Sequence, residues 1–202
     1  MDNTVGSLTQ EQESIIIGSI LGDGYLRIIK GRRNAFLEVN HSARQKEYVD
    51  WKYLKFNNLA AGLPKLRSGN GTRMAYRFYT RQHPRLTEFY QQFYPQGKKI
   101  FPVNIKLNSL CLAVWYMDDG SKCRSSDVYL NTQQFDNVSQ NRMLAALDEL
   151  GLKATLNKDK CYYRIRFVKS SLFQLKILIA KHLIPSMRYK LSYDPVETRF
   201  SL

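Results

Sequence analysis

The sequence predicts a mixed α/β (α+β) fold of two units related by a pseudo-two-fold axis, each ordered helix, strand, strand, helix, strand, strand, helix. The chain repeats itself, since Gly62-Leu63 matches Gly151-Leu152 and Arg77-Phe78 matches Arg166-Phe167, both 89 residues apart. Hydrophobic residues form 44% of the 202 residues, enough to bury a core. Two units favour a pseudo-symmetric globule, because a solenoid needs at least three. We expect units at residues 7–104 and 105–202.

Hydrophobic periodicity and turn residues place the elements of the first unit. Residues 7–21 have the pattern of a mostly buried helix that runs into Asp23-Gly24. Strands are expected next, then a helix ending near Gly62, then two strands around an Asn70-Gly71 turn and a last helix. These segments are residues 25–29, 36–40, 46–59, 65–67, 73–79 and 84–94.

The second unit repeats this order from a helix at residues 107–117 that runs into Asp119-Gly120. We expect the halves to differ in loops such as residues 30–34 and 122–126, where length changes cost little. The expected strands and helices that follow are residues 127–133, 139–150, 154–158, 162–168 and 171–179.

The charge of the chain indicates a polyanionic partner. Thirty-one Lys and Arg against 17 Asp and Glu leave a net charge of +14, with a pI near 9.7. Values of this size are typical of nucleic-acid-binding domains. A basic soluble protein or one that touches anionic membranes is the alternative on composition alone.

Cysteine content and apolar runs predict a soluble protein of a reducing, intracellular compartment. Cys111, Cys123 and Cys161 form neither a disulfide framework nor a zinc motif. Residues 1–12 are polar and acidic, unlike a signal or transit peptide, and the apolar runs are too short to span a bilayer. The three histidines form no metal-binding spacing and are expected to be structural or surface residues.

The two Asp-Gly helix ends are the candidate catalytic motifs. They read IIGSILGDG from Ile16 and LAVWYMDDG from Leu112. A carboxylate at the negative end of a helix dipole is unfavourable unless a cation is close. Gly18 and Gly22 lie on one helical face and allow another backbone, expected to be the repeat's helix, to approach. Asp23 and Asp119 would then meet and hold Mg2+, which activates water for phosphodiester hydrolysis.

Both motifs resemble the LAGLIDADG homing endonucleases. The segments KKIFP from Lys98, WYMDDG from Trp115, LNTQ from Leu130 and LIPSMRYKL from Leu183 are similar to the single-chain, two-motif, intron-encoded branch of that family. The resemblance covers nearly the whole chain. Val114 stands where the family has a small residue, so we expect close helix contact to rely on Gly18, Gly22 and Ala113.

The resemblance implies a monomer that cuts both strands of a long asymmetric DNA target across the minor groove and leaves short 3′ extensions. Asp23 and Asp119 would bind Mg2+ with the main-chain carbonyls of Gly22 and Asp118, Mn2+ would substitute, and Ca2+ would support binding without cleavage. Lys99 and Lys190 would organise the water network beside each scissile phosphate. The family's role is intron mobility, with genes of this branch carried in mitochondria or chloroplasts.

Alternation along the strands predicts a basic face and an apolar face on each sheet. The basic faces would form a saddle-shaped antiparallel surface for the major groove, where base edges are distinguishable. Arginine, asparagine and glutamine suit base contacts, and basic loop residues suit phosphates. The candidates are Arg27, Arg32, Arg33, Arg73, Arg77, Tyr79, Lys122, Asn131, Gln133, Lys158, Arg164 and Arg166.

Two other functions use the same features. An RNA-binding intron maturase could hold intron RNA on a basic, aromatic sheet, and a non-catalytic regulator could bind DNA. Intact Asp23 and Asp119 favour cleavage, because acids without a metal only repel phosphate. The sequence does not specify the DNA target, because DNA deformability also selects sequence.

Overall fold

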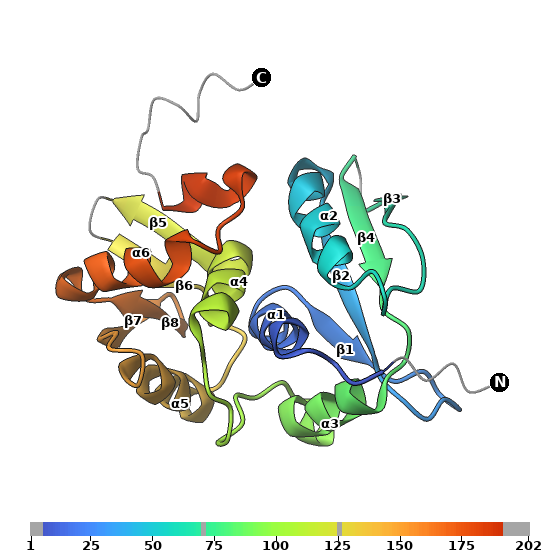
Figure 1. The fold of residues 1–202 in the computed structure, drawn as a ribbon. Helices are drawn as coiled ribbons and strands as arrows, with labels where there is room; N and C mark the ends of the chain where they lie inside the picture. The colour runs from blue at the N-terminus through green and yellow to red at the C-terminus, as the bar shows by residue number, and fades with distance from the viewer. Residues whose placement is uncertain (1–5, 70–71, 125–126, 192–202) are drawn as a thin grey trace.

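The computed structural model describes residues 6–69, 72–124 and 127–191. The expected Asn70-Gly71 turn and residues 192–202 of the second unit lie outside the described residues. Two four-stranded antiparallel sheets lie on opposite sides of a central helix pair (Figure 1). The remaining helices pack against the sheets and against this helix pair. The mixed α/β fold predicted from the sequence is confirmed.

The first half follows the predicted order closely. Thr9 begins the first helix with a capping box, its hydroxyl accepting from the Gln12 N–H while the Gln12 side chain accepts from the Thr9 N–H. The elements of this half are α1 (Gln10–Leu21), β1 (Tyr25–Arg27), β2 (Phe36–Ser42), the 3-10 helix η1 (Ala43–Gln45), α2 (Lys46–Lys55), β3 (Lys65–Ser68), β4 (Met74–Tyr79), α3 (Pro84–Phe93) and η2 (Pro95–Gly97).

The second half has the same sheet order. The first sheet runs β1-β2-β4-β3 and the second β5-β6-β8-β7. The elements of this half are α4 (Ser109–Asp119), β5 (Gly120–Arg124), β6 (Asp127–Leu130), α5 (Asn137–Asp148), β7 (Ala154–Asp159), β8 (Tyr162–Phe167), η3 (Lys169–Ser171), α6 (Leu172–Ala180) and η4 (Pro185–Lys190).

The strand predictions for the second half need two corrections. Residues 122–124, expected in a loop at 122–126, belong to strand β5, which pairs with β6 and carries a register shift between Lys122 and Arg124. Its sequence lacks the alternation of a half-buried strand, so the pattern did not reveal it. The predicted strand at 127–133 ends at Leu130; beyond it the Asn131 N–H donates to the carbonyl of Asp119, the last residue of α4, at 3.0 Å.

Each sheet turns one face to the helices, as the alternation predicts. Phe78 and Ile165 are buried on that face, whereas Arg77 and Arg166 lie on the other. The helical layer and the inner faces of both sheets form one continuous hydrophobic core. Within the described residues, no helix has the length and apolar character needed to cross a membrane.

The central helices α1 and α4 touch through two glycines, as the sequence predicts. An added Cβ at Gly18 would lie 2.5 Å from the Cys111 carbonyl oxygen and 2.7 Å from the Val114 Cβ. One at Gly22 would lie 2.3 Å from the Cβ of Asp118. Val114 therefore fills the space that Gly18 leaves, and Asp118 fills the space that Gly22 leaves.

Replacing Gly18 with alanine should lower the free energy of unfolding by about 1–3 kcal/mol, because the new methyl group meets backbone that cannot move away. Urea denaturation measures this loss. The matched control is Gly62→Ala, where an added Cβ has nothing within 4 Å. Equal stability of the two variants would contradict the close helix contact.

Candidate active site

The two predicted catalytic acids lie at the ends of the central helices. Asp23 follows Gly22, the C-terminal cap of α1, and Asp119 is the last residue of α4. Burial raises the pKa of Asp119 to about 7, with the charges of Asp23 and Asp118 adding to the effect. Burial and the charge of Asp118 likewise raise the pKa of Asp23. The helix ends thus concentrate negative charge.

The two predicted lysines lie beside these acids in equivalent positions. The Lys99 Nζ donates to the Gly22 carbonyl at 3.1 Å, and the Lys190 Nζ donates to the Asp118 carbonyl at 2.7 Å. Each lysine therefore contacts the carbonyl that immediately precedes the acid of its own half. Burial lowers the pKa of Lys99 to about 8, and burial also lowers the pKa of Lys190. The structure brings the four residues together; their catalytic roles remain predictions.

A buried cluster next to the acids was missed by the sequence reasoning. The Lys52 Nζ donates to both carboxylate oxygens of Asp118, at 2.9 and 3.1 Å. Burial alone would raise the pKa of Asp118, but Lys52 and His41 outweigh it and hold that pKa below its ordinary value. Burial and the charge of Lys52 lower the pKa of His41 to about 4. His41 thus stands neutral beside the site.

One sequence signal could have revealed Lys52. It lies on the face of α2 that Tyr48 and Val49 turn towards the core, where an apolar residue is expected. His41 had no comparable signal, because its distance from Asp118 depends on how β2 packs against the helix pair. His41 was expected to be a structural or surface residue; it is buried, and its Nδ1 lies 3.6 Å from Asp23 Oδ2.

The donors at the helix ends suit a hard divalent cation. Asp23 and Asp119 offer carboxylate oxygens, and Gly22 and Asp118 offer main-chain carbonyls, the ligand types that Mg2+, Mn2+ and Ca2+ prefer. Burial is the main cause of the raised pKa of both acids, and repulsion from the neighbouring carboxylates adds to it; a bound cation would relieve that repulsion. Side-chain donors of Asp23, His41 and Asp118 also lie within 4.8 Å of one another. The Asp118 carboxylate, however, is already paired with Lys52.

On the outer face of the first sheet, the side chains of Arg27 and Arg77 contact neighbouring side chains. Arg27 and Arg77 flank Glu38, with nitrogen to oxygen distances of 3.3 and 3.7 Å. The Arg77 guanidinium also lies over the ring of Tyr79, 5.3 Å from its centroid. Arg73, which immediately precedes β4, is exposed. Three of these four predicted DNA-binding side chains are therefore held by neighbours on the sheet.

The second sheet presents a similar face. Arg166 pairs with Asp127, and Arg164 lies 3.9 Å from the centroid of the Tyr129 ring. Asn131 and Gln133 follow β6, where the Gln133 amide donates to Asp159 at 2.8 Å. The basic, aromatic character expected for this face is present.

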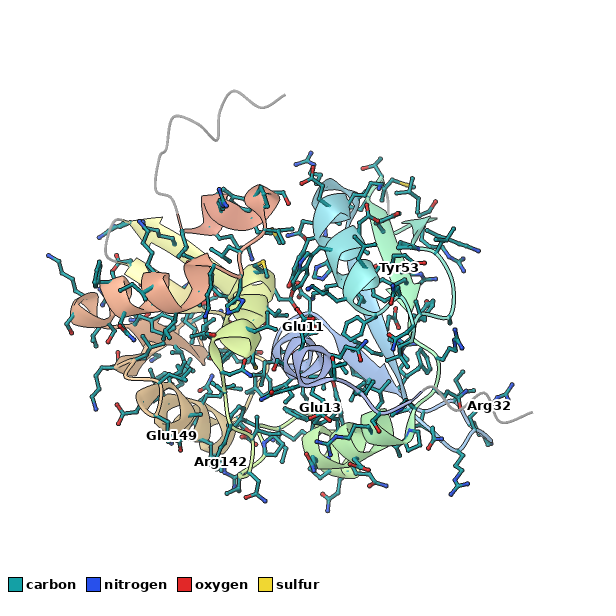
Figure 2. All side chains as sticks on the ribbon, viewed as in Figure 1. Glu11, Glu13, Arg32, Tyr53, Arg142 and Glu149 are labelled. Carbon is teal, nitrogen blue, oxygen red and sulfur yellow. The ribbon has the colours of Figure 1, made fainter. Side chains whose placement is uncertain are left out.

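The remaining predicted DNA contacts lie apart from these faces. Lys122 belongs to β5 and donates to the Leu191 carbonyl at 2.9 Å. Lys158 is exposed on β7 and pairs in register with Tyr163, on the face opposite Arg164 and Arg166. Arg32 and Arg33 lie in the exposed loop between β1 and β2, with Arg32 at the periphery of the molecule (Figure 2). These four positions lie outside the two arginine-bearing sheet faces.

Fold and site together define a class of protein: a pseudo-symmetric chain with paired acids at adjacent helix ends and two basic sheet faces. Residues 13–175 match the model of the LAGLIDADG DNA endonuclease family. The chain belongs to this family, as its two motifs predict.

Similar proteins agree with this assignment. The chain is 30% identical to the cytochrome b mRNA maturase bI2 of Debaryomyces hansenii, covering 91% of this chain and 74% of that protein. It is 26% identical to a probable intron-encoded endonuclease 1 of Wickerhamomyces canadensis, covering 93% and 87%. The structure of the homing endonuclease I-WcaI bound to its DNA recognition sequence matches with a TM-score of 0.85 at 24% identity, over 94% of this chain and 89% of that one. The chain spans about half the length of other curated relatives, including a RecA protein of Mycobacterium gastri.

Changing Asp119 to Asn should stabilise the metal-free protein at pH 8 by about 1–3 kcal/mol, because it removes a carboxylate whose charge is disfavoured by burial and by the neighbouring acids. The pKa of Asp119 is about 7 in the folded protein against an ordinary value of 3.8, so its charge is unfavourable above pH 7 and absent well below it. The gain should therefore shrink as the pH falls towards 4. Urea denaturation in EDTA at pH 8 and pH 5 measures it, and a gain that does not change with pH would argue against the raised pKa.

Proposed function

We propose that the chain is a site-specific homing endonuclease that hydrolyses one phosphodiester bond in each strand of a DNA duplex. The observation that carries this proposal is the duplicated arrangement of one acid and one lysine at each central helix end. In this proposal a single chain supplies both sites and acts as a monomer, cutting across the minor groove and leaving short 3′ overhangs. Residues 7–104 and 105–202 are its two repeats, and its biological role is mobility of the intron that encodes it, in an organelle.

The acids hold the metal and the lysines stabilise charge. Asp23 and Asp119 bind divalent ions together with the carbonyls of Gly22 and Asp118; Mg2+, when bound, activates water and stabilises the leaving oxygen. Lys99 and Lys190 lie beside the same carbonyls and place a positive charge where the phosphate becomes more negative in the transition state. The partial burial of both lysines strengthens this interaction.

The basic sheet faces read and orient the target. Arg77 and Arg166 are held by Glu38 and Asp127, so little side-chain entropy is lost when they meet base edges. Arg164 lies over Tyr129 in the same way. Lys122, Lys158, Arg32 and Arg33 remain candidates for phosphate contacts only.

Changing Asp23 or Asp119 to Asn should reduce double-strand cleavage by at least about 100-fold, because each substitution removes a metal-binding charge. Binding to the same duplex in Ca2+ should stay within about threefold of wild type, because the DNA contacts lie on the sheets. The target duplex is selected from a randomised library by its binding to the protein. Cleavage of a plasmid that carries this duplex measures the loss of activity, and a gel shift measures DNA binding. Asp148→Asn, on the surface of α5, is the control; full cleavage by both active-site variants would refute the assignment.

Changing Arg77 to Ala should weaken binding of the selected duplex by about 1–3 kcal/mol and relax the base preference at the position it contacts. Lys176→Ala, exposed on α6 in the helical layer, is the matched control and should change neither property. Binding titrations over a series of single base-pair changes measure both effects. Loss of affinity without any change in base preference would reduce Arg77 to a phosphate contact.

A second candidate function is assistance of intron splicing, favoured by the similarity to a protein named as a cytochrome b mRNA maturase. A basic sheet face with tyrosines suits single-stranded RNA as well as duplex DNA. Competition between the selected duplex and the RNA of the host intron, with splicing measured on the same preparation, separates the two functions. RNA binding and splicing without any DNA cleavage would favour the maturase.

A further inference from the structure

A buried cation supports only one of the two proposed catalytic acids. Lys52 has no exposed surface, and its Nζ contacts both Asp118 oxygens and lies 3.4 Å from His41 Nε2. The same ammonium lies 4.4 Å from the centroid of the Tyr48 ring. Taking a lysine and an aspartate fully out of water is costly, and apolar residues of similar size often give equal stability.

The other half of the chain has an uncharged residue at the corresponding buried position. Helix α5 buries Ser139, Gln140 and Met143, with the same i, i+1, i+4 spacing as Tyr48, Val49 and Lys52 on α2. Met143 has a similar length to lysine and is completely buried. By this burial pattern Met143 corresponds to Lys52, and packing at the position does not require a charge.

The contacts of the Lys52 cluster lead to Asp23. The Asp23 N–H donates to Asp118 Oδ2 at 3.3 Å, and His41 Nδ1 lies 3.6 Å from Asp23 Oδ2. His41 Nε2 in turn lies 3.7 Å from Asp118 Oδ1. Asp118 reaches this place because it fills the space beside Gly22, which has no side chain of its own.

Asp119 is held by a different set of groups. The Gln134 amide donates to Asp119 Oδ2 at 3.4 Å, and the Asn131 N–H donates to the Asp119 carbonyl at 3.0 Å. Gln134 is exposed and also accepts from the Lys99 ammonium at 3.3 Å. Across the described part of the chain, Lys52, His41 and the Asp118 carboxylate make no hydrogen bond to the Asp119 side chain.

We propose that Lys52 is a positioning residue that fixes Asp23 through Asp118 and His41, whereas Gln134 positions Asp119, so that the two strand cuts depend on different supports. This inference rests on the proposed function. Lys52 acts by holding the Asp118 carboxylate where it accepts the Asp23 N–H. A displacement of a catalytic group by about 1 Å can cost on the order of 100-fold in rate.

The first experiment compares Lys52→Met, Gln134→Ala and wild type on the selected duplex, with a different fluorophore on each strand, in saturating Mg2+. Lys52→Met should slow the cut of one strand by about tenfold more than the other, and Gln134→Ala should shift the ratio in the opposite direction. Met143→Ala is the matched control, because it opens the core at the corresponding position of α5 without touching a charged group. It should lower stability and leave the ratio of the strand rates unchanged.

A second measurement does not depend on cleavage. Hydrogen exchange of the metal-free protein, followed by NMR, should be faster at the Asp23 amide in Lys52→Met and unchanged at the Asn131 amide. If Lys52→Met does not fold, His41→Ala keeps the pair of Lys52 and Asp118, and it should shift the strand ratio in the direction predicted for Lys52→Met.

The outcomes separate the two proposals. The inference would be overturned if Lys52→Met slowed both strand cuts equally, or if His41→Ala did so where Lys52→Met does not fold. It would also be overturned if Gln134→Ala shifted the strand ratio in the same direction as Lys52→Met. Either result would leave the proposed nuclease function standing. Wild-type protein that cuts neither strand would instead overturn the proposed function.

Discussion

The backbone contact between α1 and α4 determines where every other feature of the molecule lies. Gly18 and Gly22 bring the two helices so close that Val114 and Asp118 occupy the space of missing side chains. Because both helices end at the same side of this contact, their terminal acids become neighbours. One sheet lies on each side of this helix pair (Figure 1). A looser helix pair would separate the acids and tilt the two sheets relative to each other.

Negative charge at these helix ends is balanced by fixed cations. Two acids and the Asp118 carboxylate meet where the helix dipoles are also negative, which is unfavourable in isolation. Lys52 neutralises Asp118 inside the core, while Lys99 and Lys190 contact the last carbonyls of the helices. Lys99 closely follows η2 and Lys190 ends η4, so short 3-10 turns place both ammonium groups. The site therefore keeps its acids together before any ligand binds.

Sequence periodicity predicted most of the fold, because the repeat, the helix ends and the strand faces are local patterns. Asp23 and Asp119 came together as expected from matching positions in the two halves, and Lys99 and Lys190 lie beside them as the family resemblance implied. Strand β5 was missed because its pairing with β6 is decided by tertiary contacts, which override weak local alternation. Lys52 lies on the apolar face of α2, a signal that was overlooked, whereas His41 has no such signal because its contact with Asp118 depends on how β2 packs against α4.

A repeat within one chain permits an asymmetry that identical subunits could not have. Each half keeps the acid, the lysine and the sheet order, since these define the shared site and fold. Elsewhere the halves differ: Lys52 on α2 pairs with Asp118, whereas α5 has the uncharged Met143 at the corresponding buried position. An asymmetric DNA sequence requires different contacts from its two ends. The halves also differ at the helix ends, where Asp23 and Asp119 occupy equivalent positions but contact different neighbours.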